Sequence, residues 1–312
     1  MALILVLASL GWLALQRGDI PHDSLEAKYG SPASRFMDLP GDLRVHYRDE
    51  GRRDGPTLVL VHGYAASLHA WEPWVRALSS DYRVISLDLP GHGLTRSDQG
   101  YTAGRPGFEA VVDQVTRRLG VERFTLAGNS MGGGVAWSYA IRHPERVEGL
   151  VLVDPAGWPS SGGQQALIFR ILQQPLGRAL LKNIDTRQLV RQGLQAAYLD
   201  PALVTPVLVD RYVELARAPG HRDVLLSLQA GPRGEATPQR LAAINAPTLV
   251  MFGAEDRLIP AADGPRFTAA IPGATLITYP GVGHVPMEQI PDRSAADLKT
   301  WLKARVYAAA EP

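Results

Sequence analysis

The pentapeptide Gly128-Asn129-Ser130-Met131-Gly132 constrains the fold of this chain more than any other stretch. Residues 123–127 before it have the pattern of a short buried strand, and residues 133–143 after it have the small and apolar residues of a helix packed on a sheet. A serine between glycines at a sharp strand-to-helix turn is exposed at the tip of that turn. The pattern therefore predicts that Ser130 is a nucleophile and that the Met131 N–H points toward a developing oxyanion. The alternative is a glycine-rich turn that carries an ordinary serine.

Two further candidate catalytic residues follow predicted strands in the second half of the chain. Residues 247–253 are predicted to form a strand that leads to Asp256, and residues 274–279 another that leads to a glycine-rich loop with His284. A carboxylate just past a strand end can orient an imidazole, which can then act as a general base. The order Ser130, Asp256, His284, each after a strand, is that of a catalytic triad in an α/β sheet.

Other polar residues compete for these roles. Glu255 is an immediate rival for the acid, and Asp154, near the end of a predicted strand, is the second alternative. His62 follows a buried strand and is predicted to brace its loop rather than to act as the base. Asp88 and His92 invite a metal-site or dyad interpretation, but their turn favours a role in fixing loop geometry.

The segment from about residue 36 to residue 306 resembles an α/β-hydrolase fold enzyme. The matching motifs are His62-Gly63-Tyr64-Ala65, Asp88-Leu89-Pro90-Gly91-His92-Gly93, Gly128-Asn129-Ser130-Met131-Gly132-Gly133, Gly253-Ala254-Glu255-Asp256 and Gly283-His284. The resemblance implies that the Tyr64 backbone N–H is a second oxyanion donor, paired with that of Met131. It also implies a mostly parallel central sheet with helices on both faces and an inserted helical cap.

Within this superfamily the chain is most similar to bacterial serine esterases and lipases. It also resembles the carbon–carbon bond hydrolases that act on ring meta-cleavage products. Its turn at residues 62–65 lacks the Gly-Pro-Gly that many meta-cleavage hydrolases carry there, which disfavours that reading. Haloalkane dehalogenases and epoxide hydrolases share the layout but use aspartate as the nucleophile, so Ser130 argues against both.

The predicted domain organisation has three parts. Residues 1–24 form a hydrophobic anchor or signal segment, residues 25–156 and 244–312 form the α/β-hydrolase core, and residues 157–243 form a helical cap or lid. The cap is predicted to contain helices over residues 165–174, 176–183, 186–198 and 204–217. Its apolar stretch 167–172 is predicted to cover an apolar acyl pocket, with membrane contact or packing on the main domain as alternatives.

Composition bounds the remaining possibilities. The chain has 312 residues, of which 46% are hydrophobic, so it can bury a large core. A net charge of +1 provides no strong field for nucleic acid. The chain has no cysteine, which excludes disulfides, thiolate catalysis and cysteine-ligated zinc. Neither a cofactor nor a metal is implied by the motifs.

Residues 2–15 are almost wholly apolar. As a helix they would extend about 21 Å, short of a hydrocarbon core of about 30 Å. Three interpretations compete: an uncleaved membrane anchor, an export signal that lacks its basic flank, and a helix packed on the protein's own surface. The composition favours the first two, so we expect a protein that is membrane-associated or exported, in a bacterial cell envelope.

The predicted activity is hydrolysis of a carboxylic ester, with a small-molecule substrate whose acyl group is apolar. Carbon–carbon hydrolysis or perhydrolysis at the same triad is an alternative chemistry. A non-enzymatic binding protein of the same fold is an alternative of another class, because a fold alone does not establish a function. The sequence does not indicate the acyl chain length, the alcohol or the oligomeric state.

Overall fold

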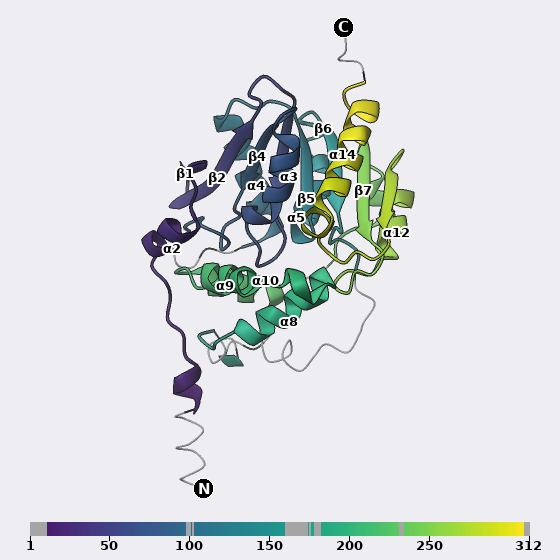
Figure 1. The fold of residues 1–312 in the computed structure, drawn as a ribbon. Helices are drawn as coiled ribbons and strands as arrows, with labels where there is room; N and C mark the ends of the chain where they lie inside the picture. Colours follow the sequence, from purple (N-terminus) through teal and green to yellow (C-terminus); the bar gives the residue numbers. More distant parts are fainter. Residues whose placement is uncertain are drawn as a thin grey trace.

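A computed structural model describes residues 11–97, 101, 103–159, 174, 176–177, 182–230 and 234–308 (Figure 1). Within these residues the chain builds one eight-stranded sheet in the order β1-β2-β4-β3-β5-β6-β7-β8. The strands are β1 (Ser34–Leu39), β2 (Leu43–Gly51), β3 (Thr57–Val61), β4 (Arg83–Leu87), β5 (Phe124–Asn129), β6 (Val147–Val153), β7 (Thr248–Gly253) and β8 (Thr275–Tyr279). The pairs β1·β2 and β2·β4 are antiparallel, and all other pairs are parallel. The predicted α/β-hydrolase fold class is confirmed.

The central strands are parallel because helices cover both of their faces. Strands β5 and β7 are buried at every residue, and β3 is buried from its second residue on. Strands of this kind have continuous apolar sequences rather than alternating ones, which is the pattern in residues 57–61 and 248–252. The carboxyl ends of the parallel strands therefore meet at one edge of the sheet, where the predicted site residues follow.

Each face of the sheet has its own group of helices and its own hydrophobic core. One face packs α4 (Arg105–Arg118), α5 (Met131–Arg142) and α12 (Asp263–Ala270), and the other packs η1 (Leu68–Trp71), α3 (Glu72–Leu78) and α14 (Pro291–Arg305). Helices α3 and α14 lie side by side (Figure 1). The buried Trp74 indole N–H donates to the Ser294 hydroxyl at 2.8 Å, which joins these two helices.

Helices inserted between β6 and β7 lie beyond the edge at which the parallel strands end (Figure 1). They are α8 (Arg187–Tyr198), η2 (Pro201–Leu203), α9 (Pro206–Leu215) and α10 (His221–Ala230). The short α11 (Pro238–Leu241), which also precedes β7, packs instead against α5 and α12. Helices α8 and α9 lie within the predicted ranges 186–198 and 204–217, whereas α10 was not predicted. The apolar stretch 167–172, residues 165–173 of the predicted helix 165–174 and residues 178–181 of the predicted helix 176–183 lie outside the described residues. The three predicted domain boundaries stay a prediction.

The predicted membrane or envelope localisation needs correction. Among the described residues no helix is both long enough and apolar enough to cross a bilayer. Residues 11–15 form the end of a helix, and the chain then pairs with the inserted segment: the Arg17 N–H donates to the Asn183 carbonyl at 2.7 Å, and the Asp185 N–H donates to the Leu15 carbonyl at 2.8 Å. Residues 1–10 of the predicted apolar segment lie outside the described residues. An apolar run is thus not enough to infer a spanning segment.

Candidate active site

The turn between β5 and α5 holds Ser130 in a strained conformation. Its φ of 54° lies in the left-handed region, which residues other than glycine rarely adopt. Neighbouring glycines make the turn possible: a Cβ on Gly128 would lie 2.2 Å from the Gly132 carbonyl oxygen, and a Cβ on Gly132 would lie 2.2 Å from the Val61 carbonyl oxygen. Both contacts are far inside van der Waals distance. The glycines therefore permit the close approach that presents Ser130 between the strand and the helix.

The two predicted oxyanion donors belong to segments that flank Ser130. Met131 is the first residue of α5, where backbone N–H groups lack an intrahelical acceptor. Tyr64 follows Gly63, and a Cβ on Gly63 would lie only 3.2 Å from the Ser130 Cβ. The Tyr64 hydroxyl donates to the Leu225 carbonyl at 3.1 Å, which ties this loop to α10. The loop with Tyr64 and the start of α5 are thus adjacent to the same serine.

His284 and Asp256 form a buried pair. The His284 Nδ1 lies 2.7 Å from the Asp256 Oδ2, and the two side chains are 7% and 0% exposed. The other carboxylate oxygen, Oδ1, accepts the N–H groups of Leu258 at 2.7 Å and Ile259 at 3.0 Å. Three donors therefore surround this carboxylate and stabilise its negative charge. The geometry fixes the imidazole with Nδ1–H toward Asp256 and leaves Nε2 for a reacting group.

Asn129 links the serine turn to the histidine loop, a role that sequence reasoning missed. Its buried side-chain amide donates to the Val153 carbonyl at 3.1 Å and to the His284 carbonyl at 3.0 Å. The His284 N–H in turn donates to the Ala197 carbonyl of α8 at 2.7 Å. Nothing in the motif itself indicates these partners, because they come from β6, from the loop after β8 and from the inserted helices.

The rivals for acid and base are engaged elsewhere. Glu255 accepts the N–H groups of Gly281 at 2.7 Å and Val282 at 3.1 Å, so it braces the histidine loop. The His62 ring uses both nitrogens on backbone groups: Nδ1 donates to the Gly63 carbonyl at 2.7 Å, and Nε2 accepts the Leu89 N–H at 3.0 Å. Burial lowers the pKa of His62. These contacts engage one carboxylate oxygen of Glu255 and both ring nitrogens of His62.

Asp88 and His92 serve the loop that follows β4. The Asp88 carboxylate accepts the N–H groups of Leu68 at 2.7 Å and Leu94 at 2.8 Å, and it pairs with the buried His46 ring at 2.7 Å. The His92 Nδ1 donates to the Pro90 carbonyl at 3.0 Å within the same turn. Both residues therefore fix the geometry of the loops beside the serine turn.

Asp154, the second candidate acid, lies against the His284–Asp256 pair. One oxygen or nitrogen atom from each of these three side chains lies within 4.8 Å of the other two, a spacing at which a metal ion could be held. The observed 2.7 Å between His284 Nδ1 and Asp256 Oδ2 is too short for two ligands of one tetrahedral zinc ion, which would lie about 3.4 Å apart at usual bond lengths. The cluster is thus arranged for hydrogen bonding.

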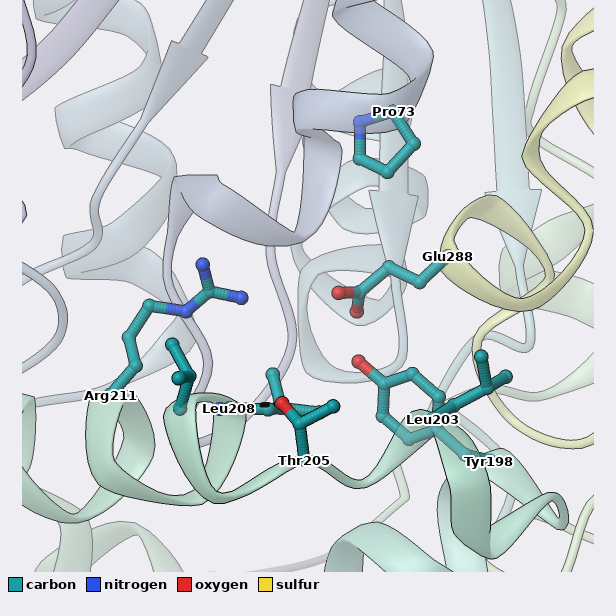
Figure 2. A pocket seen from close by; sticks show the side chains of 8 residues that line it. Pro73, Tyr198, Leu203, Thr205, Leu208, Arg211 and Glu288 are labelled. Carbon is teal, nitrogen blue, oxygen red and sulfur yellow. Dashed lines mark hydrogen bonds between the residues drawn. The ribbon is translucent and has the colours of Figure 1, made fainter.

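A cavity of about 300 Å³ lies between the inserted helices and the core. Its lining residues are Pro73, Tyr198, Leu203, Thr205, Val207, Leu208, Arg211 and Glu288. Figure 2 shows the Tyr198 hydroxyl and the Glu288 carboxyl group pointing toward each other, with the Arg211 guanidinium beside them. Burial raises the pKa of Glu288 to about 7. Among the described residues Arg211 forms no ion pair, but its guanidinium acts electrostatically on the carboxyl groups of Glu72 and Glu288, so the cavity combines a cation and an acid with apolar walls.

Comparison with known proteins finds a matching family model, curated relatives and solved structures that resemble this chain. Residues 56–290 match the family model described as alpha/beta hydrolase fold. The chain is 30% identical over 288 residues to the dihydrolipoyllysine-residue acetyltransferase component of the acetoin cleaving system of Cupriavidus necator, covering 89% of this chain and 71% of that protein. It is 30% identical over 277 residues to the 2-hydroxy-6-oxononadienedioate/2-hydroxy-6-oxononatrienedioate hydrolase of Comamonas testosteroni, covering 81% of this chain and 91% of that enzyme. Among solved structures, a bacterial membrane phospholipase A aligns with a TM-score of 0.74 and 26% identity over 97% of both chains.

Proposed function

This chain belongs to the α/β-hydrolase fold family, and from that premise we propose that it is a serine hydrolase that cleaves carboxylic esters through an acyl-enzyme. The observation that carries the proposal is the 2.7 Å hydrogen bond from His284 to the buried Asp256, next to a serine held at φ 54° in a strand-to-helix turn. The similarity to a phospholipase A over nearly the whole chain supports ester chemistry in particular.

In the proposed mechanism Ser130 Oγ attacks the ester carbonyl while the His284 Nε2 accepts the hydroxyl proton. The Asp256 carboxylate holds the imidazole tautomer and stabilises the imidazolium that forms. The N–H groups of Met131 and Tyr64 bind the oxyanion of the tetrahedral intermediate, and losing one such donor typically costs about 10²–10³ in rate. His284 then protonates the departing alkoxide, and water releases the acyl group by the same steps in reverse order.

The direct test is a panel of p-nitrophenyl esters of graded acyl length, assayed with the wild type and with Ser130→Ala. We expect turnover by the wild type and a loss of about 10⁴-fold or more in the variant, because the nucleophile is gone. A fluorophosphonate probe should label only the wild type. Ester turnover that survives the substitution, after the variant has been shown to be pure and folded, would contradict the assignment.

Carbon–carbon bond hydrolysis is the second candidate. Two observations favour it. The relative from Comamonas testosteroni bears the name of a dienedioate hydrolase. The cavity lined by Glu288 of α13 (Pro286–Gln289), the short helix that follows His284, also holds the Arg211 guanidinium, which forms no ion pair among the described residues. A guanidinium of this kind suits the carboxylate of a keto acid. The same triad then adds water across the bond between the ketone carbonyl carbon and its neighbouring carbon: the carbonyl side leaves as a carboxylic acid, and the other carbon takes up the proton.

The two candidates differ in their dependence on Arg211. A yellow ring-cleavage diketo acid and a neutral p-nitrophenyl ester are compared as substrates of the wild type, Arg211→Met and the exposed control Arg76→Met. Carbon–carbon hydrolysis predicts turnover of the diketo acid and a loss of about 10²-fold in kcat/KM in Arg211→Met, the magnitude expected for one charged hydrogen bond. Ester hydrolysis predicts turnover of the neutral ester, with only a small effect of the same substitution.

A further inference from the structure

Two buried carboxyl groups lie against the same imidazole, and they differ in the donors around them. Asp256 accepts three hydrogen bonds, from His284, Leu258 and Ile259. Asp154 is fully buried, and its Oδ1 accepts only the Gly253 N–H at 2.9 Å. Its Oδ2 has no hydrogen-bond partner among the described residues. A buried, charged carboxylate oxygen without a hydrogen-bond donor is costly, so the question is whether Asp154 is ionised at all.

Electrostatic repulsion between Asp154 and Asp256 indicates that one of these two carboxyl groups is protonated. Like charges a few ångströms apart in a buried site cannot both be ionised at moderate cost, so one carboxyl group binds a proton. Asp256 has three donors to support a negative charge, and Asp154 has one. We propose that Asp154 is a neutral carboxylic acid that donates a hydrogen bond to the Asp256 carboxylate and so acts as a positioning residue behind the His284–Asp256 pair.

The surroundings of Asp154 support this assignment. Burial, and next the charge of Asp256, raise the pKa of Asp154 well above its usual range. The titratable groups that face it are Asp256 after β7, His284 after β8 and Tyr279 at the end of β8, and none of them supplies a positive charge while His284 is neutral. Asp154 also has a φ of 43°, a strained conformation that the surrounding structure must hold. Its proton therefore has the Asp256 carboxylate as its natural acceptor.

The proposed proton has two consequences for the site. The pair of carboxyl groups presents a single negative charge to the imidazole rather than two, which sets the strength of the base. The added donor also restrains the Asp256 carboxylate, which in turn orients the His284 ring. Ester hydrolysis through Ser130 needs this orientation of the imidazole, so the predicted effect on kinetics rests on the proposed function. The protonation state of Asp154 does not depend on it.

Infrared spectroscopy tests the protonation state without any substrate. The difference spectrum between the wild type and Asp154→Asn at pH 7 should contain the carbonyl band of a protonated carboxyl group that the variant lacks. The exposed control Asp292→Asn should instead remove only carboxylate bands. If the Asp154 difference also shows only carboxylate bands, Asp154 is ionised and the inference is wrong. A protein with the protonated band but no ester turnover would refute the proposed function and leave the protonation intact.

Kinetics tests the positioning role. Asparagine keeps a donor in this place and is neutral, so Asp154→Asn should retain most of kcat and leave the midpoint of the acid limb of the kcat/KM profile nearly unmoved. Glycine tolerates the φ of 43° but removes the donor, so Asp154→Gly should lose about 10–100-fold in kcat with little change in KM. An acid limb that moves by a whole pH unit or more in Asp154→Asn would show that a negative charge was removed. Equal kcat in both variants would show that the donor has no role.

Discussion

Replacing Asn129 by aspartate removes two hydrogen-bond donors with almost no change in side-chain size. The amide group donates to the carbonyls of Val153 and His284, at 3.1 and 3.0 Å. Because both partners are acceptors, the nitrogen must face them, and a carboxylate in the same place would oppose two carbonyl oxygens with a negative charge. We therefore expect Asn129→Asp to separate the serine turn from the histidine loop.

The expected magnitude comes from the two lost bonds and their burial. Each hydrogen bond contributes about 1 kcal/mol net, and a buried carbonyl left without a donor costs about 1–3 kcal/mol. That cost applies to the His284 carbonyl, since the Val153 carbonyl still accepts the Ser130 N–H at 3.0 Å. Asn129 is only 3% exposed, so water cannot easily replace the lost donor. The free energy of unfolding should fall by about 2–4 kcal/mol, a large part of the roughly 5–15 kcal/mol of a typical domain. Ester turnover should fall by about 10²-fold because a displaced imidazole is no longer aligned.

Two measurements separate these effects. Urea unfolding gives the change in stability, and the rate of fluorophosphonate labelling under conditions where the variant is folded gives the change in serine reactivity. Asn129→Ala serves as the matched variant, since it removes the same bonds without adding a charge, and it should lose less than the aspartate in both assays. An aspartate variant with wild-type stability and labelling rate would refute the reasoning.

Three further predictions follow from individual contacts. Gly132→Ala should destabilise the fold by about 1–3 kcal/mol, because its Cβ would meet the Val61 carbonyl oxygen. Gly193→Ala, on the exposed side of α8, should instead stabilise the fold by about 0.5–1 kcal/mol. Thermal unfolding of both variants tests this difference, and equal shifts of the two melting temperatures would contradict it. Since burial raises the Glu288 pKa from 4.5 to about 7, its contribution to stability is fully present below about pH 4.5 and is lost as pH rises through about 7. Glu288→Gln should therefore be more stable than the wild type at pH 8, by an amount on the order of 3 kcal/mol, and should show no such gain at pH 4; parallel pH–stability curves would exclude this role. Asp256→Asn should reduce kcat by about 10⁴-fold, and fluorophosphonate labelling should become slow while still depending on Ser130. A loss of less than tenfold in kcat would indicate that another carboxylate supports His284.

Much of the fold was predictable because local patterns agree with the tertiary arrangement. Continuous apolar runs predicted the parallel strands, and their order along the chain predicted that Ser130, Asp256 and His284 follow strand ends at one edge of the sheet. The structure places Asp256 within hydrogen-bond distance of His284, as that order implied, and the catalytic roles stay a proposal. The membrane or envelope prediction was wrong because hydrophobicity over a short segment carries no information about what the segment packs against.

Contacts between distant segments were not predictable in the same way. The bridge from Asn129 to the His284 carbonyl joins residues 155 positions apart, and no local pattern indicates it. Helix α10 was missed, although its buried His221 bonds to the carbonyls of Leu215 and Thr95 and fixes it to the core. The cavity around Arg211 likewise forms from η2, α8, α9, α13 and the start of α3, which are separated along the chain.

The amino-acid sequence by itself determined the alternation of strands and helices, the glycines of the serine turn and the order of the three candidate catalytic residues, because these depend on side-chain size, backbone freedom and hydrophobic period along a short stretch. The tertiary structure alone decided how many hydrogen-bond donors surround each of the two acids that lie near the imidazole. Asp154 and Asp256 follow neighbouring parallel strands and are chemically identical in the sequence. Their ionisation states differ because the folded protein places more hydrogen-bond donors around Asp256 than around Asp154. Hydrogen bonds and burial, rather than residue type, determine which carboxyl group carries the charge.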